Sequence, residues 1–285
     1  MLALRFWPKV NYSVSCYVAF HCYGLTIHHE RLIMTLLEKT TVATAIVASN
    51  IVKSYQVGDD SVEILHGVSL EVVTGEMVAV MGASGSGKST LMYCLAGLEE
   101  PTSGTVRIGN QPLSKLSRSE LAVIRRSDVG FVFQSYNLIP TLTAAENISL
   151  PYTVAKKKAP KEKINEVLNK LGLAERASAQ PPSMSGGEQQ RVALARVLVQ
   201  QPEVIFADEP TGALDTRTGD VVLNELVNIA HTPGHCVLVV PHDPKVAAAS
   251  DRVLFMRDGI LVNEISGGSV ELIAATLAGL TWSEA

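Results

Sequence analysis

The chain has 285 residues, of which 47% are hydrophobic and 18% are charged, and its formal net charge at pH 7 is -4. This composition is typical of a folded globular protein and excludes an intrinsically disordered one. The chain lacks the excess of positive charge with which proteins bind nucleic acid, so we expect no nucleic-acid partner.

Residues 1–33 differ in pattern from the rest of the chain. The uncharged stretch from Val10 to Ile27 contains Asn, Ser and His, which makes it a poor membrane span, and it lacks the apolar core and cleavage site of a signal peptide. We interpret residues 1–33 as an N-terminal extension; the alternative is a start-site artefact, with translation beginning at Met34. Because they contain none of the motifs below, we expect these residues to be dispensable.

The four cysteines are too few and too scattered for a disulfide framework. Cys94 and Cys236 lie in apolar runs, where a thiol packs as a small hydrophobic group. Cys16 and Cys22, together with His21, are candidate metal ligands, but their spacing matches no standard site. The cysteine pattern therefore favours a reducing compartment.

The first half of the chain alternates between strand and helix patterns. Apolar or alternating runs bounded by turn residues predict strands, and a run that ends at Gly97 predicts a helix. The predicted elements are strands within 45–56 and 63–81, a helix over 88–98, a hairpin at 103–113 and a buried strand at 129–134.

The second half begins with a helical pattern over 143–179, in which we interpret the segment KKKAPKEK as a solvated face. The other predicted elements are a helix over 188–199, buried strands at 203–210 and 235–243 with a helix at 219–230 between them, a hairpin at 252–265 and a short helix at 269–280. Buried strands that alternate with helices predict an α/β protein with a largely parallel sheet.

A phosphate-binding motif follows the strand MVAVM and precedes a helix. The sequence GASGSGKST has the spacing G-x-x-x-x-G-K-[ST], in which glycines let backbone N–H groups point at phosphate oxygens. In such a loop, Lys88 reaches the β- and γ-phosphates and the Ser89 hydroxyl binds Mg²⁺. The predicted nucleotide-binding residues are Gly82, Ala83, Ser84, Gly85, Ser86, Gly87, Lys88, Ser89 and Thr90.

Two acids stand side by side at the end of the predicted buried strand in VIFADEP. Asp208 is placed to hold the Mg²⁺ shell, and Glu209 is placed to polarise the attacking water. Adjacent acids at an apolar strand end are costly unless an ion or a reaction uses them, although helix capping by one of them is an alternative.

The stretch SGGEQQR opens a strong helix-forming run. The Ser185 hydroxyl, the Gly186 and Gly187 amides and the helix dipole form a second candidate anion site. Together with the phosphate motif and the acid pair, this stretch resembles the ATP-binding cassette (ABC) family, in which it is the signature motif. The resemblance covers about residues 45–266.

The resemblance implies an α/β P-loop NTPase (RecA-like) fold with a parallel-sheet core, an antiparallel β subdomain and an α-helical signature subdomain at about 136–195, followed by a short helical tail at 267–285. It also implies that ATP and Mg²⁺ are the cofactors and that two copies of the chain sandwich two nucleotides head to tail. The residues that would bind the ATP of the other copy are Ser185, Gly186, Gly187 and Glu188.

Other positions match the family one at a time. Tyr55 corresponds to the aromatic residue that stacks on adenine, although by itself it is an ordinary strand aromatic. Gln134 corresponds to the glutamine that touches Mg²⁺ and the attacking water, and the segment after it faces the membrane subunit. His242 corresponds to the switch histidine at the γ-phosphate, although alone it would be structural. The stretch that resembles the dimer-interface loop is Gly212, Ala213, Leu214 and Asp215.

Three positions depart from the family pattern. Met184 replaces the usual leucine, which conserves volume. Glu188 stands where glutamine is common. Pro241 replaces a more typical threonine and removes a backbone donor at a strand end, which leaves the pose of His242 open.

Within the family, VGFVFQSYNLIPTLTAAENISLP and EPTGALDT most resemble the MacB/LolD group, whose ATPases drive permeases with four transmembrane helices per subunit. Members expel amphiphiles such as antibiotics, peptides and haem, or release lipoproteins from the membrane, and the haem-efflux subgroup is our favoured assignment. The resemblance implies a MacB-type permease as partner and a place at the cytoplasmic face of the cell membrane.

Three other classes of ATPase have related cassettes. An ATPase of the FtsE type, which regulates cell division, has a similar cassette and stays an alternative. A chromosome or repair ATPase would carry a coiled coil or a zinc insertion between Lys88 and Asp208, and a translation-factor ATPase would carry two cassettes. The sequence shows none of these features.

Overall fold

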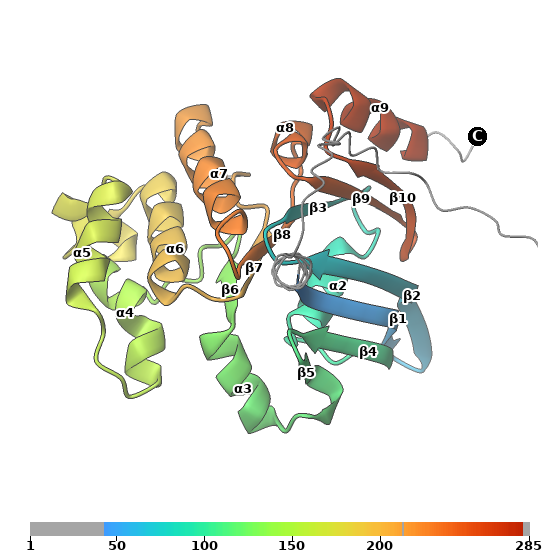
Figure 1. Cartoon of the computed structure of the whole chain (residues 1–285), viewed down its shortest axis with the longest axis horizontal. Helices are drawn as coiled ribbons and strands as arrows, with labels where there is room; N and C mark the ends of the chain where they lie inside the picture. The colour runs from blue at the N-terminus through green and yellow to red at the C-terminus, as the bar shows by residue number, and fades with distance from the viewer. Residues whose placement is uncertain (1–42, 213, 282–285) are drawn as a thin grey trace, which may run out of the picture. The chain divides into compact units, whose positions relative to one another are not determined.

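The computed structural model describes residues 43–212 and 214–281. In these ranges two sheets form the framework, and helices cover the larger one (Figure 1). The predictions for residues 1–33, including the candidate ligands Cys16, His21 and Cys22, lie outside the described residues. Within the described ranges, no helix is long and apolar enough to cross a membrane.

The larger sheet consists of β3 (Met77–Met81), β6 (Val129–Val132), β7 (Val204–Asp208), β8 (Cys236–Val240), β9 (Arg252–Arg257) and β10 (Ile260–Ser266). The spatial order is β10-β9-β3-β8-β7-β6. All neighbours pair in parallel except β10, which is an antiparallel edge strand on β9. Every residue of β3 and β8 is buried, because helices or the second sheet cover both faces.

The smaller sheet is antiparallel and consists of β1 (Thr44–Val57), β2 (Asp60–Val73), β4 (Ser103–Ile108) and β5 (Gln111–Pro112), in the order β2-β1-β4-β5. The hairpins predicted at 103–113 and 252–265 are confirmed by the pairs β4–β5 and β9–β10. One of the two hydrophobic cores contains residues of both sheets.

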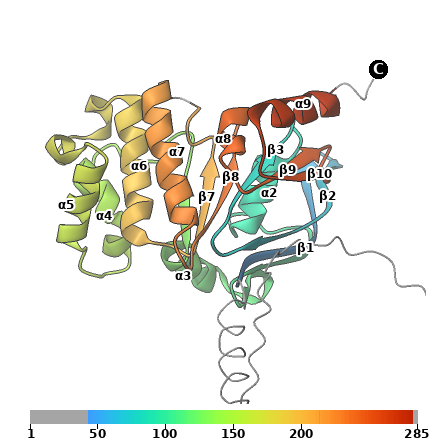
Figure 2. The ribbon, with the colours of Figure 1, turned by 45° about the horizontal axis from the view of Figure 1, so that its top comes forward.

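The helices are α2 (Lys88–Leu95), α3 (Arg118–Ser127), α4 (Ala144–Val154), α5 (Lys161–Lys170), α6 (Gly186–Gln200), α7 (Thr216–Ala230), α8 (Pro244–Ala248) and α9 (Val270–Thr281), with 3-10 turns at Leu113–Lys115, Ala174–Arg176 and Pro181–Ser183. Figure 2 shows α4, α5 and α6 side by side, and α7 next to α6. The short tail helix predicted at 269–280 is confirmed by α9.

Strand β3 shows how the two cores are divided. Met77, Ala79 and Met81 point to one face of the large sheet and belong to the core that contains residues of α4 to α7. Val78 and Val80 point to the other face and belong to the core that contains α2 and the antiparallel sheet. The period-two alternation of the strand therefore places α2 between the two sheets.

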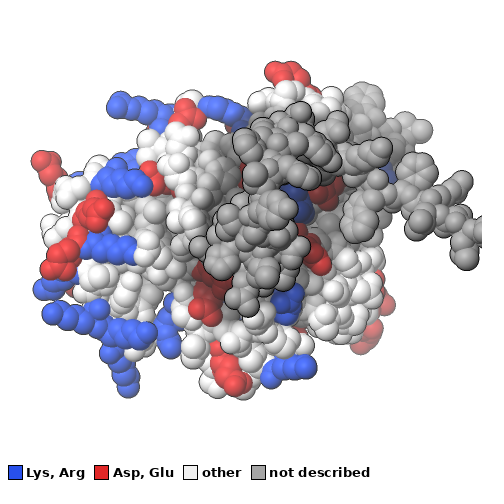
Figure 3. Space-filling model, viewed as in Figure 1, with Lys and Arg blue, Asp and Glu red and all other residues white. Residues whose placement is uncertain are grey.

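Two local features differ from the sequence prediction. Helix α3 was not predicted, although its start carries a capping box in which the Glu120 carboxylate accepts a hydrogen bond of 2.8 Å from the Ser117 N–H. The helical pattern over 143–179 is divided into α4, α5 and a 3-10 turn. Helix α4 ends before Lys156, which has a left-handed φ of 54°, and α5 begins directly after Pro160. The lysines of the KKKAPKEK segment are mostly exposed, and Figure 3 shows basic side chains projecting from the region of α4 and α5.

Candidate nucleotide-binding and catalytic site

The residues of the phosphate loop, 82–87, connect β3 to α2. A Cβ atom at Gly82 would lie 2.1 Å from the carbonyl oxygen of Met256, so only glycine fits there. Gly87 has φ of 95°, the left-handed region that glycine adopts without steric cost. The loop therefore needs glycine at both ends of its predicted motif.

Lys88 curls back over the phosphate loop. Its Nζ donates to the carbonyl oxygens of Gly82 at 3.0 Å and Ala83 at 2.7 Å, and lies 3.4 Å from the Ser86 hydroxyl oxygen. Burial lowers the pKa of Lys88, and the negative charges of Glu209 and Asp208 act in the opposite direction. The ammonium thus lies at the centre of the loop, within electrostatic reach of the acid pair.

The acid pair lies at the carboxyl end of β7. Burial raises the pKa of Asp208, whose Oδ2 accepts a hydrogen bond of 3.3 Å from the Tyr93 hydroxyl. Glu209 has φ of 47°, an uncommon left-handed conformation for a residue with a side chain. Its N–H donates to the Val240 carbonyl oxygen at 3.0 Å, which anchors this turn to the end of β8.

His242 forms an ion pair between its Nε2 and the Glu209 carboxylate. Pro241 stands between the end of β8 and this histidine. The missing N–H of Pro241 therefore does not prevent the His242 side chain from reaching the acid pair.

Gln134 is exposed and lies two residues after the end of β6. The carboxyl ends of parallel strands meet at one edge of a sheet. This edge therefore brings together the phosphate loop after β3, Gln134 after β6, Asp208 and Glu209 at β7, and His242 after β8.

Tyr55 lies in β1, outside this edge, but it reaches the same region through α2. Its hydroxyl donates to the Glu99 carboxylate, and Thr90, two residues after Lys88, lies near enough to lower the pKa of Tyr55. The aromatic ring is thus placed beside the first turn of the helix that follows the phosphate loop.

The signature residues form the start of α6. The Ser185 hydroxyl oxygen accepts from the Glu188 N–H at 3.2 Å, and the Glu188 carboxylate accepts from the Ser185 N–H at 2.7 Å. Glu188 also pairs with Arg176 at 2.9 Å. Ser185 is exposed and uses its oxygen as a helix cap, which leaves its hydroxyl proton to donate to a ligand.

A Cβ atom at Gly186 would lie 2.8 Å from the Tyr136 hydroxyl oxygen, so the end of the Tyr136 side chain would have to move to make room for it. Tyr136 belongs to the segment after Gln134, and hydrogen bonds also join this segment to α6. Arg196 donates to the carbonyl oxygens of Tyr136 at 3.2 Å and of Asn137 at 3.2 and 3.3 Å.

The predicted interface loop connects Glu209 to α7. The Gly212 N–H donates to the Glu209 carbonyl oxygen at 3.2 Å, and the Leu214 N–H donates to that of Thr211 at 3.1 Å. Asp215 caps α7 by accepting from the Thr218 N–H at 3.0 Å. Ala213 lies outside the described residues.

The sequence analysis missed two side chains that contact the segment from Asp208 to Pro210. Tyr93 in α2 donates to Asp208, as described above. Gln190 in α6 is 1% exposed and donates through Nε2 to the Pro210 carbonyl oxygen at 2.8 Å. A glutamine within a helix carries no sequence signal for such a contact, because its partner is 20 residues away in the chain.

The site fits ATP and Mg²⁺ by the chemistry of its donors. The phosphate loop offers backbone N–H groups, a buried ammonium and the N-terminus of α2 to an anion. Ser89, Gln134 and Asp208 offer hydroxyl, amide and carboxylate oxygens, which are the ligand types that Mg²⁺ prefers. No cluster of three His, Cys, Asp or Glu side chains suited to another metal occurs among the described residues.

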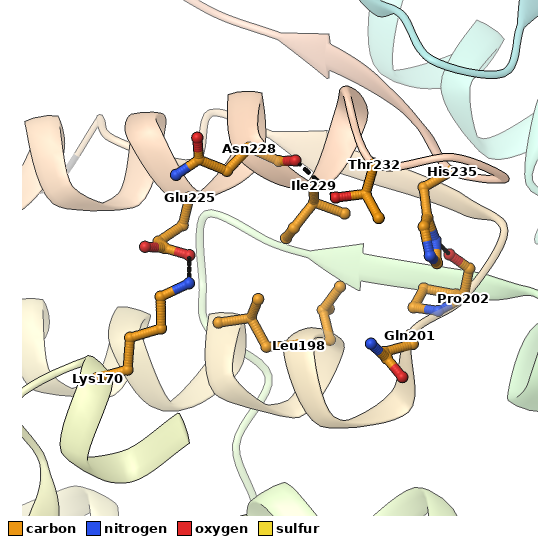
Figure 4. A pocket seen from close by; sticks show the side chains of 10 residues that line it. Lys170, Leu198, Gln201, Pro202, Glu225, Asn228, Ile229, Thr232 and His235 are labelled. Atoms are coloured by element: carbon orange, nitrogen blue, oxygen red, sulfur yellow. Dashed lines mark hydrogen bonds and ion pairs between the residues drawn. The ribbon is translucent and has the colours of Figure 1, made fainter. Parts of the chain in front are cut away.

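A cavity of about 150 Å³ lies elsewhere, between α5, α6 and α7. Figure 4 shows Lys170 and Glu225 pointing toward each other at its edge, where they form an ion pair of 2.6 Å. His235 is held at the other end by a contact of 2.6 Å between its Nδ1 and the Pro202 carbonyl oxygen. The cavity contains none of the predicted site residues.

Comparison with known proteins assigns the family. Residues 65–212 match the family model described as ABC transporter. The chain is 47% identical over 221 residues to the ABC transporter ATP-binding protein YvrO of Bacillus subtilis (strain 168), covering 77% of this chain and 96% of that protein. It is 44% identical over 237 residues to the macrolide export ATP-binding/permease protein MacB of Escherichia coli (strain K12), covering 80% of this chain but 36% of that protein.

Solved structures agree with these relatives. The dimeric structure of the ABC transporter cassette MJ0796 has a TM-score of 0.74 and 40% identity, and the match covers 79% of this chain and 99% of that one. A dimeric post-hydrolysis state of MJ0796 bound to ADP and Pi matches with the same TM-score at 39% identity, over the same shares of the two chains. The chain therefore belongs to the ABC transporter family as an ATP-binding cassette with the P-loop NTPase fold, an ATP hydrolase that uses ATP and Mg²⁺ and whose activity is coupled to transport.

Proposed function

We propose that this cassette is the motor of a MacB/LolD-type exporter, in which two copies close around two ATP and drive a permease that expels or extracts an amphiphile. The observation that carries the two-copy arrangement is the division of the site. The phosphate loop and the acids lie at one edge of the large sheet, whereas the exposed Ser185 hydroxyl lies at the start of α6. The phosphate loop already surrounds the phosphates of the ATP on the same chain, so the second anion site at Ser185 has no further anion to bind there.

In this arrangement each residue has a defined role. Lys88 holds the β- and γ-phosphates, and Tyr55 stacks on adenine. Ser89, Gln134 and Asp208 hold Mg²⁺, which neutralises phosphate charge when bound. Glu209 polarises the attacking water, and His242 contacts the γ-phosphate and holds Glu209. The ATP of the other copy is bound by the signature residues Ser185, Gly186, Gly187 and Glu188.

A reciprocal heterodimer experiment tests the composite site. One engineered dimer joins a Ser185→Arg chain to a Lys88→Ala chain, which leaves one composite site with wild-type Lys88 facing wild-type Ser185. We expect hydrolysis of at most half the wild-type rate. The matched control joins a wild-type chain to a chain that carries both substitutions, which damages both composite sites with the same mutations.

The two hypotheses predict hydrolysis by different heterodimers. If each chain hydrolysed ATP with its own signature, the control dimer would keep one intact site and the first dimer would keep none. Activity confined to the control, or full activity of a strictly monomeric chain, would reject the proposal.

The permease partner is proposed from the MacB relatives, at the cytoplasmic face of the cell membrane. The segment after Gln134 is the proposed contact, and it presents Ile139, which is 39% exposed. A MacB-type permease that copurifies with the chain and stimulates hydrolysis would support this, whereas copurification of division proteins alone would favour the FtsE-like alternative. Haem efflux is the narrower proposal; stimulation of the complex by haem, but not by macrolides or lipoproteins, tests it.

A further inference from the structure

The end of β1 is fastened to the turn that follows α2. The Ser54 N–H donates to the Thr102 hydroxyl oxygen at 2.9 Å, and the Thr102 N–H donates to the Val52 carbonyl oxygen at 2.8 Å. The first of these bonds connects residues 48 positions apart in the chain. The strand that carries Tyr55 is therefore held in a fixed place beside Glu99.

Glu99 is the central residue of this contact. Its carboxylate accepts the Tyr55 hydroxyl and lies 3.4 Å from the Lys53 Nζ. The N–H of Glu99 donates to the Tyr93 carbonyl oxygen at 3.1 Å, so the carboxylate is presented from the end of α2. Burial, followed by the effect of Glu99, raises the pKa of Tyr55 to about 12, so the hydroxyl stays a proton donor.

Lys53 completes the group. Its Nζ donates to the Glu100 carbonyl oxygen at 2.8 Å and lies 4.9 Å from the centre of the Tyr55 ring. A cation over an aromatic ring occupies one ring face. The hydroxyl end of Tyr55 is thus tied to Glu99 and one face of its ring is covered by the Lys53 ammonium, so a stacking partner would use the opposite face.

We propose that Glu99 is a positioning residue for the nucleobase, which fixes the Tyr55 ring in the orientation that stacks on the base of ATP. The proposal rests on the assignment of Tyr55 as the stacking residue. A tyrosine that is already held in its binding orientation loses less side-chain freedom when the base arrives. Glu99 itself contacts neither the base nor the phosphates.

The test compares ATP with ribose 5-triphosphate, which lacks the base, by isothermal titration calorimetry of the full chain with Mg²⁺. Glu99→Ala should weaken ATP binding by about 2- to 10-fold, the range of an aromatic stacking contact. Glu99→Gln keeps an acceptor for the Tyr55 hydroxyl and loses only the ion pair, so its effect should be smaller. Neither substitution should change the affinity for ribose 5-triphosphate.

Two further variants separate positioning from a general effect on the fold. Glu100→Gln is the matched control, because Glu100 is exposed and meets Lys53 through its backbone carbonyl alone among the contacts described. It should leave both affinities unchanged. In a Tyr55→Ala background, Glu99→Ala should have no additional effect on ATP binding, because Glu99 acts through the ring.

Several results would overturn the proposal. Equal weakening of ATP and ribose 5-triphosphate by Glu99→Ala would show a general effect on the site. A normal ATP affinity for Glu99→Ala, with a weakened one for Tyr55→Ala, would reject the role of Glu99 and keep that of Tyr55. If Tyr55→Ala also left ATP affinity unchanged, the stacking assignment itself would fall, although ATP binding by the phosphate loop would stand.

Discussion

Gln190 donates a hydrogen bond of 2.8 Å to the carbonyl oxygen of Pro210, the residue directly after Glu209. Both residues are buried, and the donor belongs to the helix that begins with the signature glycines. The bond therefore joins the element proposed to bind one ATP to the turn proposed to hydrolyse another.

Replacing Gln190 by leucine should lower both stability and turnover. The Pro210 carbonyl would lose its donor, and a buried polar group without a partner costs about 1–3 kcal/mol in free energy of unfolding. We expect the turnover number to fall more than the ATP affinity, because the displaced turn carries Glu209. Chemical denaturation and steady-state ATPase kinetics measure the two effects.

The control for this variant is Gln189→Leu. Gln189 donates to the Met184 carbonyl oxygen at 3.1 Å, so it contacts the start of its own helix and not the Glu209 turn. Equal turnover numbers for the two variants would contradict a specific role for Gln190.

Glu209→Gln should nearly abolish hydrolysis while ATP still binds. The substitution keeps the shape of the side chain but removes the carboxylate proposed to polarise water, and such a group contributes about 10²- to 10⁴-fold. We expect turnover by the complex with its permease to fall at least about 100-fold. Near-normal turnover would exclude this role of Glu209. Lys88→Ala, by contrast, should weaken the binding of the nucleotide itself.

Gly186→Ala should be harmful, and a second substitution should repair it. The new Cβ would lie 2.8 Å from the Tyr136 hydroxyl oxygen, and because the end of this side chain can move, the cost should be at the low end of overpacking, about 1 kcal/mol. Tyr136→Phe removes this oxygen, so the double variant should regain stability and ATPase activity relative to Gly186→Ala. A double variant as impaired as the single one would show that the clash is not the cause.

The capping box of α6 should make stability depend on acid pH. The backbone hydrogen bond from Ser185 is the first cause that holds the pKa of Glu188 below its usual value. A group with a depressed folded pKa stabilises the protein above its unfolded pKa of about 4.3, and this contribution is lost as the pH falls through the folded pKa.

Glu188→Gln provides the measurement, because glutamine keeps a side-chain acceptor for the Ser185 N–H but does not titrate. The difference in unfolding free energy between the two proteins should be largest near pH 6–7 and should shrink as the pH falls below about 4.3. Denaturation curves at several pH values test this. A difference that grows toward low pH would contradict the sign of the shift.

Much of the large sheet could be predicted from the sequence, because strands such as β3 and β8 are short, fully apolar and bounded by turn residues. The strand over Met77–Met81 is confirmed to the residue. Helix α3 was missed because it is short and mostly polar, with Ile124 as its only buried residue, although its Ser-x-x-Glu start was a usable signal.

The site could be predicted only where spacing along the chain carries the chemistry. The phosphate loop is contiguous, so its residues were recognisable from the motif. The contacts of Tyr93 with Asp208 and of Glu99 with Tyr55 connect residues 115 and 44 positions apart. Such contacts depend on how α2 packs between the two sheets, which no local pattern encodes.

Helix α6 is in mechanical terms a rigid element that carries three functional positions along its length. Ser185 caps its start, Gln190 donates a hydrogen bond to the turn after Glu209, and Arg196 donates hydrogen bonds to the carbonyl groups of Tyr136 and Asn137. At a rise of 1.5 Å per residue, the first and last of these positions are about 16 Å apart. A displacement of the segment after Gln134 should therefore either tilt α6, which would move both Ser185 and the turn after Glu209, or break the hydrogen bonds of Arg196.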